Sequence, residues 1–268
     1  MFCAFMLLFA GIYTVTINVQ SSYANFEYVL SNMDFIYIII IPVLTMRVIS
    51  EERKQRTDTL LYSLPVSMTK VVVAKYLAML SVLLVPVVIM GFYPLVLSLF
   101  GTVNFLSAYS SLLGFFLLGA SLIAMGMFAS SVTDNQALAA GLAFLIVIVN
   151  YFITSFAYYL SGTAKASLIA LAITVLAIGI LVYILTKDYS VAGVVTVIGE
   201  GVLFFMYFAF PTKLEGLFPA IIEKLSLFER FTVFTEGVFS LVSVIYYVLV
   251  SAIFVFITVQ SMEKRRWS

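Results

Sequence analysis

The chain has 268 residues, of which 63% are hydrophobic and only 10% are charged, and its mean hydropathy is +1.16. Soluble domains carry about a quarter charged residues, so this composition indicates a protein that crosses a membrane several times. The chain has no histidine, which argues against a hydrolase triad, a zinc site or a histidine-ligated haem. Its one cysteine, Cys3, excludes an intrachain disulfide.

The apolar runs predict eight membrane spans. A helix needs about 20 mostly apolar residues to cross the hydrocarbon core of a bilayer, which is about 30 Å thick. We expect spans at about residues 2–19, 28–49, 72–100, 107–131, 137–160, 166–186, 191–210 and 239–260. The predicted fold is an all-α polytopic membrane protein with one transmembrane domain, 1–268. Its apolar start lacks a basic segment and a cleavage site, so we interpret it as a retained span, not a signal peptide.

Residues 76–133 carry no charged side chain, and this stretch is too long for one span. The cluster Gly101 to Asn104 is the natural turn between the third and fourth spans. Pro86 and Pro94 are expected to bend the third span, because each removes a backbone donor and clashes one turn back.

Basic residues predict the orientation, since lysine and arginine are retained on the cytoplasmic side. Eight spans with both termini in the cytoplasm leave outside only Lys165, Lys213, Lys224 and Arg230. The basic residues inside are then Arg47, Arg53, Lys54, Arg56, Lys70, Lys75, Lys187, Lys264, Arg265 and Arg266. We therefore expect a multi-pass protein of the inner or plasma membrane.

The segment 211–238 has a different pattern from the spans around it. Apolar residues recur at three- and four-residue spacing with charges between them, at Leu214, Leu217, Phe218, Ile221, Ile222, Leu225 and Phe228. This spacing gives one face of an amphipathic helix that lies at the membrane interface or enters it partway. In the eight-span arrangement this segment is external.

The segment 51–66 is the most polar part of the chain, and it lies on the cytoplasmic side in this arrangement. A charged patch precedes three leucines there, which predicts a short helix with an apolar edge that suits docking into a groove of a partner. The alternative is a solvated loop that only sets topology. The sequence G-x-x-x-x-G-K-[ST] does not occur in the chain, so energy for any work comes from another chain or from an ion gradient.

The run from Pro42 to Ser67, PVLTMRVISEERKQRTDTLLYSLPVS, resembles the signature of the export-type (type-2) ABC transporter permeases. The closest-looking branch is that of the gliding-motility permeases. The loop from Ser130 to Gln136 and the C-terminal Glu263 to Trp267 resemble further parts of that family.

The resemblance implies a non-catalytic permease subunit that pairs with a second permease subunit, either itself or a paralogue, and with separate ATP-binding subunits. ATP and magnesium then belong to the partner, with no cofactor, metal or nucleic acid in this chain. The segment from Glu51 to Leu64 corresponds to the family's coupling helix, and 211–238 to its external half-membrane helices. The coupling residues are Glu51, Glu52, Arg53, Lys54, Arg56, Asp58, Leu60, Leu61 and Leu64; Asp134 and Asn135 lie on a second cytoplasmic loop.

The chain departs from this family in two ways. Members usually begin with a basic amphipathic helix, whereas this sequence starts in an apolar run. The family core commonly has six spans, so the extra pair falls at about 166–210. The export-type architecture implies an amphiphilic, lipid-like, peptide or drug cargo.

Two polar residues fall inside predicted spans. A carboxylate near the centre of a span costs at least about 2.5 kcal/mol to insert, so Glu200 should face protein or water. It is either a substrate contact or proton carrier, or a neutral, hydrogen-bonded side chain between helices. Asn150 is interpreted as an interhelical hydrogen-bonding residue.

Two other functions remain open at this point. An ion-coupled carrier or channel would use Glu200, and a membrane anchor would assemble a surface or motility machine. An enzyme embedded in the membrane is the weakest interpretation, because the chain has no histidine and no clustered carboxylates.

Overall fold

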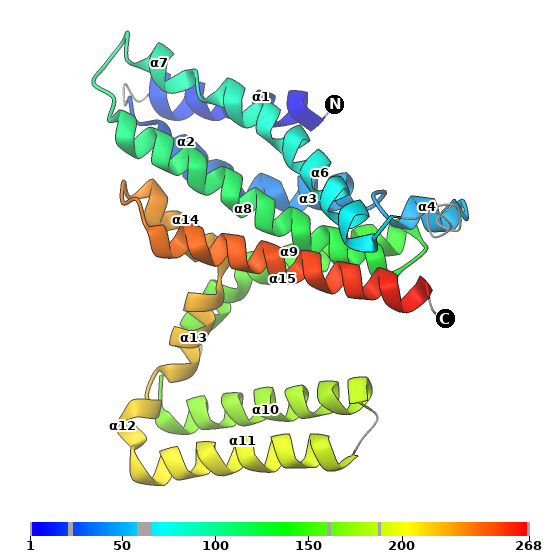
Figure 1. Ribbon diagram of the computed structural model, residues 1–268. Coiled ribbons are helices and arrows are strands. Elements are labelled where there is room, and N and C mark those ends of the chain that lie inside the picture. The colour runs from blue at the N-terminus through cyan, green and yellow to red at the C-terminus, as the bar shows by residue number, and fades with distance from the viewer. Residues whose placement is uncertain (1, 21–23, 58–65, 160–161, 187–188, 267–268) are drawn as a thin grey trace. The chain divides into compact units, whose positions relative to one another are not determined.

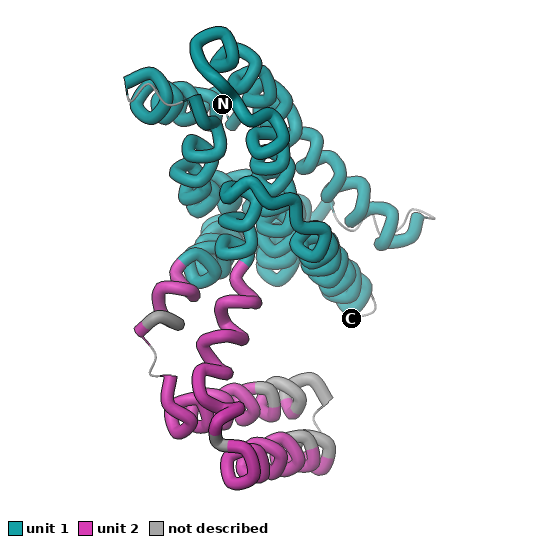
Figure 2. Tube along the Cα trace, turned by 90° about the vertical axis from the view of Figure 1, so that its left-hand side faces the viewer, with its two compact units in different colours: residues 1–151, 227–268 teal, residues 152–226 magenta. Residues whose placement is uncertain are grey.

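The computed structural model describes residues 2–20, 24–57, 66–159, 162–186 and 189–266, and all regular elements in these ranges are helical. The helices form two compact units (Figure 2). Unit 1 consists of Met1–Tyr151 and Leu227–Ser268, and unit 2 of Phe152–Ser226. The all-α prediction is therefore confirmed, and the single predicted domain is divided into two units.

Unit 1 contains most of the helices (Figure 1). In chain order they are α1 (Phe2–Tyr13), the π-helical η1 (Thr14–Val19), α2 (Phe26–Met33), the 3₁₀-helical η2 (Asp34–Ile36), α3 (Tyr37–Thr45), α4 (Ser50–Lys54), α6 (Met68–Met90), α7 (Tyr93–Leu97), α8 (Phe105–Val132), most of α9 (Gln136–Tyr159), α14 (Leu227–Thr235) and α15 (Leu241–Arg266). Unit 2 contains the end of α9 followed by α10 (Ala164–Thr186), α11 (Tyr189–Ala209), α12 (Pro211–Leu214) and α13 (Leu217–Leu225).

Six helices in the described ranges are long and apolar enough to cross a membrane. They are Phe2–Val19, Phe26–Lys54, Met68–Leu97, Phe105–Val132, Gln136–Phe156 and Leu241–Arg265. They match the first five predicted spans and the last one. A seventh is reached only if Thr196–Ala209 and Thr212–Leu225, which are bent by 119°, count as one broken span.

The sixth and seventh predicted spans coincide with α10 and α11, which pack side by side in unit 2 (Figure 1). Their contact is close because a Cβ atom on Gly199 would lie 2.7 Å from a methyl group of Val175. Gly179 lies against Thr196 in the same way, so the two helices are antiparallel. That this hairpin crosses the membrane twice stays a prediction.

The helix α8 is the centre of unit 1, and it packs against α2, α3, α6, α14 and α15. Small residues permit this: a Cβ atom on Gly114 would lie 2.7 Å from the Phe234 ring of α14. Hydroxyl groups then fix the neighbours, since Ser111 donates to the Phe234 carbonyl at 2.9 Å and Ser121 to the Tyr247 carbonyl at 3.0 Å. Backbone carbonyls and small polar residues are the usual means of joining helices in a bilayer.

The third predicted span is interrupted as its prolines suggested. The helix α6 contains Pro86 and ends at Met90, and α7 starts at Tyr93 with Pro94 near its N-terminus. At that position a helix has no acceptor for a backbone N–H, so the proline costs little.

The predicted amphipathic segment 211–238 is not one continuous helix. The segment forms α12, α13 and α14, separated at Gly216, whose φ of +69° is left-handed, and at the extended Ser226. The α14 helix buries Leu227, Phe228, Phe231 and Phe234 in unit 1, whereas no residue of α13 in unit 2 is buried. The apolar residues recur regularly, but the backbone changes direction at Gly216 and Ser226. The apolar residues of α14 are therefore buried, whereas those of α13 are not.

A helix that continues through the predicted coupling segment is also wrong for its described part. The α4 helix ends at Lys54, and the chain turns over residues 55–57. Asp58, Leu60, Leu61 and Leu64 lie outside the described residues, so their predicted role is neither supported nor opposed by the fold.

Candidate functional site

The polar segment around α4 is held to unit 1 through its backbone. The amide groups of Ile49 and Ser50 both donate to the hydroxyl of Ser130, at 3.2 and 3.1 Å. Lys75, on α6, donates to the carbonyl of Val48 at 2.8 Å and forms an ion pair with Glu52. The start of α4 is thus fastened to α8 and α6.

Arg53 fastens the other side of α4. Its side chain is only 2% exposed, although it lies in a run of charged residues. The guanidinium donates to the carbonyl of Ser131 at the end of α8, and it lies 3.8 Å from the carboxylate of Asp134. The sequence analysis named both Arg53 and Asp134, and the structure brings them together.

The C-terminal end of α15 meets the same carboxylate. Arg265 forms an ion pair with Asp134 at 2.5 Å and donates to the carbonyl of Val132 at 3.4 Å. Ser261, one turn earlier, donates to the carbonyl of Ser131 at 3.3 Å. We call Ser130, Ser131, Val132 and Asp134, with Arg53 and Arg265, the α8-end cluster.

The α8-end cluster has a simple electrostatic basis. The last carbonyls of a helix have no partner within it and carry partial negative charge. The α8 helix ends at Val132, and the next residue, Thr133, is extended and not left-handed. Arginines from α4 and α15 therefore supply donors and positive charge that a glycine cap would not.

The outer side of the α4 segment is exposed. Lys54, Gln55, Arg56 and Thr57 are exposed to solvent, whereas Arg53 is buried between them and α8. The segment thus has an anchored inner side and an exposed, positively charged outer side.

The turn after α4 contains a strained residue. The amide of Arg56 donates to the carbonyl of Arg53 and that of Thr57 to the carbonyl of Glu52, the pattern of a Schellman motif. That motif requires a left-handed residue, and Arg56 takes this place with a φ of +56°. Glycine would fit there without steric cost.

Asn135 has a local structural role. Its side-chain oxygen accepts a hydrogen bond from the amide of Ala137 at 2.9 Å, which caps the N-terminus of α9. Of the two predicted residues on this loop, Asp134 is the one that faces Arg53 of the described part of the coupling segment.

The two polar residues inside predicted spans lie in different units. In unit 1, Asn150 accepts a hydrogen bond from the amide of Leu227 at 3.1 Å and so fixes the start of α14. In unit 2, Glu200 has a carboxylate oxygen, Oε1, that is shielded from solvent and has no hydrogen-bond partner in the described part of the chain.

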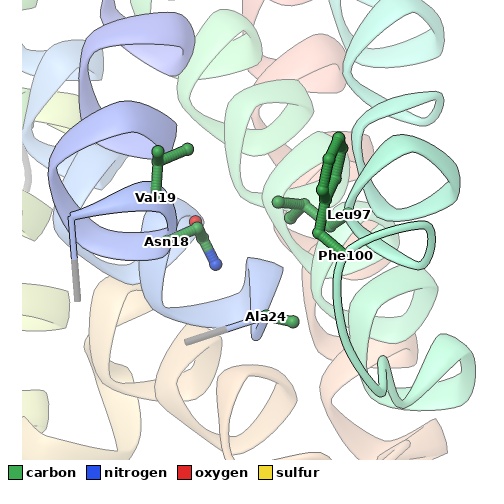
Figure 3. Close-up of a pocket in the computed structure, with 5 residues that line it drawn as sticks. All are labelled: Asn18, Val19, Ala24, Leu97 and Phe100. Atoms are coloured by element: carbon green, nitrogen blue, oxygen red, sulfur yellow. The ribbon is translucent and has the colours of Figure 1, made fainter. Parts of the chain in front are cut away.

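A hollow at the opposite end of unit 1 is mostly apolar. A cavity of about 300 Å³ lies between the end of η1 and the region after α7, lined by Asn18, Val19, Ala24, Leu97 and Phe100 (Figure 3). Among the described residues that line it, Asn18 has the polar side chain, and its amide donates to the carbonyl of Asn25 at 3.0 Å. These side chains offer no acid, base or nucleophile.

Arg265 is the charged member of the α8-end cluster that sequence reasoning did not single out as a site residue. It entered there only as a basic residue on the inside and as part of the C-terminal run Glu263 to Trp267. Its contact with Asp134 joins residues 131 positions apart, and no local pattern predicts such a pair.

The α4 segment is anchored to two long helices of the bundle and is exposed on its outer side. In a comparison with protein families, the profile of the ABC-2 family transporter proteins matches residues 8–168, which is more than half of the chain. The chain belongs to this family and is a membrane permease subunit of an ABC transporter. No curated protein and no solved structure matches it significantly.

Proposed function

We propose that this permease subunit belongs to an ATP-driven exporter, and that a separate ATP-binding subunit docks on the segment from Glu51 to Leu64. The observation that carries the proposal is the burial of Arg53 against the end of α8, beside a neighbouring surface that is exposed. A partner held by that surface can transmit force to α8 through Arg53 and the two amides bound by Ser130.

The α8 helix connects the α4 segment to distant parts of unit 1. The α8 helix has 28 residues, so it is about 42 Å long at 1.5 Å per residue. Its opposite end carries α14 through Ser111 and Phe234. A displacement at α4 is thereby connected to helices on the other side of the bundle, which is what a change between inward- and outward-facing states requires.

The remaining parts of the proposal come from the family resemblance. ATP and magnesium bind to the partner, a second permease subunit completes the pathway, and α4 with both termini lies in the cytoplasm. The cargo is amphiphilic, lipid-like, a peptide or a drug. Kinship with the gliding-motility permeases belongs to the same proposal and rests on the run from Pro42 to Ser67.

Co-purification tests the docking step. We expect the full chain, coexpressed with an ATP-binding subunit, to retain that subunit in detergent. The double substitution Leu60→Asp/Leu61→Asp should abolish retention, because a carboxylate in an apolar groove loses its hydration without gaining a partner. Lys70→Asp, which changes an exposed residue at the start of α6, should retain the subunit. Full retention by the Leu60/Leu61 variant, with the chain still folded, would contradict the docking assignment.

A second function is favoured by one observation, the shielded and unpartnered oxygen of Glu200. In an ion-coupled carrier this carboxylate would take up and release a proton or cation. Transport by such a carrier would be lost in Glu200→Gln and would continue without an ATP-binding subunit. Transport by the proposed exporter would continue in Glu200→Gln and would stop without the ATP-binding subunit.

A further inference from the structure

The end of α8 is bound by two helices that come from opposite ends of the sequence. Residue Arg53 of α4 and residue Arg265 of α15 share one carboxylate, that of Asp134. They also occupy neighbouring carbonyls in the last turn of α8, those of Ser131 and Val132. Ser261 adds a second hydrogen bond from α15 to the Ser131 carbonyl.

We propose that the C-terminal end of α15 is part of the coupling device: Arg265 and Asp134 join α15 to α4 through the end of α8, so that a partner that displaces α4 moves α15 with it. This inference rests on the proposed function, since it assumes that an ATP-binding subunit acts on α4. It assigns Arg265 and Asp134 as positioning residues, because neither needs to touch the partner or the cargo.

The contacts favour a movement of α4, the end of α8 and the end of α15 as one rigid body, and not a separation of these elements from one another. Arg53 is buried, and its guanidinium holds a backbone carbonyl as well as facing a carboxylate. Arg265 likewise holds Asp134 and a carbonyl with two different nitrogens. Planar, two-point contacts of this kind fix orientation as well as distance.

Movement of α15 would act on α14. Tyr247, buried on the same helix, donates from its hydroxyl to the carbonyl of Leu227 at 2.7 Å. Leu227 is the first residue of α14, and its amide is held by Asn150. The step from Arg265 to Tyr247 is about 27 Å along the helix. Through α15, the coupling segment is therefore connected to α14 by a second route besides α8.

Spin-label distances in the assembled transporter test this inference. Cys3 is the only cysteine, so a Cys3→Ser background permits pairs of labels at Gln55→Cys, Lys264→Cys and Phe100→Cys. Gln55 and Lys264 are exposed beside the two arginines, and Phe100 is 84% exposed at the other end of unit 1. Each pair is measured in the complex with its ATP-binding subunit, first without nucleotide and then trapped with MgATP and vanadate.

We expect the distance from Phe100 to Gln55 and that from Phe100 to Lys264 to change together on trapping, while Gln55 to Lys264 stays constant. In Arg265→Gln the Phe100–Gln55 change should persist, and the Phe100–Lys264 change should fall to less than half. Asp134→Asn, which keeps the shape of the side chain, should act in the same direction. Lys70→Gln, which removes an exposed cation with no contact to the α8-end cluster, should behave as the native chain.

The outcomes separate the two proposals. If the Phe100–Gln55 distance ignores nucleotide in the native complex, the proposed function fails and this inference with it. If that distance responds and the Phe100–Lys264 change stays complete in both variants, the role of α15 alone is overturned. A merely structural role for Arg265 would lower the melting temperature of the variants and leave the trapped distances unchanged.

Discussion

Arg53 and Lys54 show how much two adjacent cations can differ. The Arg53 side chain is nearly inaccessible and holds the end of α8, whereas Lys54 faces solvent. Arginine suits the inner place, because its planar guanidinium can bond a carbonyl while it faces a carboxylate. Lysine suits the outer place, where a flexible and strongly hydrated ammonium group remains available to a partner.

This difference predicts opposite effects of the same substitution. Arg53→Gln should destabilise the protein by about 1–3 kcal/mol, because the Ser131 carbonyl loses its charged donor and keeps the weaker one of Ser261. Lys54→Gln should leave the melting temperature in detergent unchanged and weaken only the binding of the ATP-binding subunit. Equal melting temperatures for the two variants would show that Arg53 does not hold α4 to α8.

Arg56 gives a second prediction for a single residue. A non-glycine residue in the left-handed region costs roughly 1–2 kcal/mol, so Arg56→Gly should stabilise the turn after α4 and slow hydrogen exchange of the Thr57 amide. Gln55→Gly is the control, since Gln55 has an ordinary φ of −85° and gains nothing from glycine. Faster exchange in Arg56→Gly would indicate that the arginine side chain itself maintains the turn.

Among the elements, α8 decides how closely the rest of unit 1 can pack. Its serines and glycines let α14 and α15 approach its backbone, and its hydroxyls then bond their carbonyls. The sequence predicted a span at 107–131, but an uncharged helix of small residues is equally compatible with facing lipid. Only the packing shows that this one is central.

Two glycines in spans provide a matched pair. Gly114→Ala should destabilise the protein by about 1–3 kcal/mol, because the added methyl group meets Phe234 and forces α14 away. Gly141→Ala should be neutral or slightly stabilising, since nothing lies within 4 Å of the added atom and alanine favours a helix. The melting temperatures of the purified variants provide the comparison. A tolerated Gly114→Ala would mean that α14 is loosely packed.

At the scale of the whole molecule, the number of spans decides on which side each polar segment lies. In the sequence, unit 2 lies between the two segments of unit 1, and it contains the hairpin of α10 and α11, which raises the number from six to eight only if it crosses the membrane. The charge bias of the sequence fits eight spans with the C-terminus inside. If the hairpin did not cross the membrane, the C-terminus would still lie inside. The side of the C-terminus alone therefore does not distinguish six spans from eight.

Labelling of single cysteines in intact cells distinguishes these arrangements. In a Cys3→Ser background, an impermeant maleimide should fail to label Ser190→Cys and Lys264→Cys and should label Lys213→Cys. Labelling at position 190 with protection at 264 would support six spans. If labelling of Gln55→Cys and Lys264→Cys places these residues on opposite sides of the membrane, the number of spans between them is odd. Permeabilised cells, in which all positions react, are the control.

The sequence by itself determined the class of the molecule and the positions of its helices. Long uncharged runs have no stable place other than a bilayer or a protein interior, so most span boundaries could be predicted to within a few residues. The short charged segment between two such runs was equally visible, and it led to Arg53 as a candidate coupling residue, whereas Asp134 was placed on a second cytoplasmic loop. These features follow from local composition, which one sequence shows directly.

The tertiary structure decided which of these residues meet. Arg265 joins Asp134 across most of the chain, and its role depends on where α15 lies against α8, which no local pattern encodes. The division of 211–238 at Gly216 and Ser226 was missed for the same reason, since its apolar spacing continued across two changes of backbone direction. Periodicity reports which residues avoid water, whereas helix packing determines what each of them contacts instead.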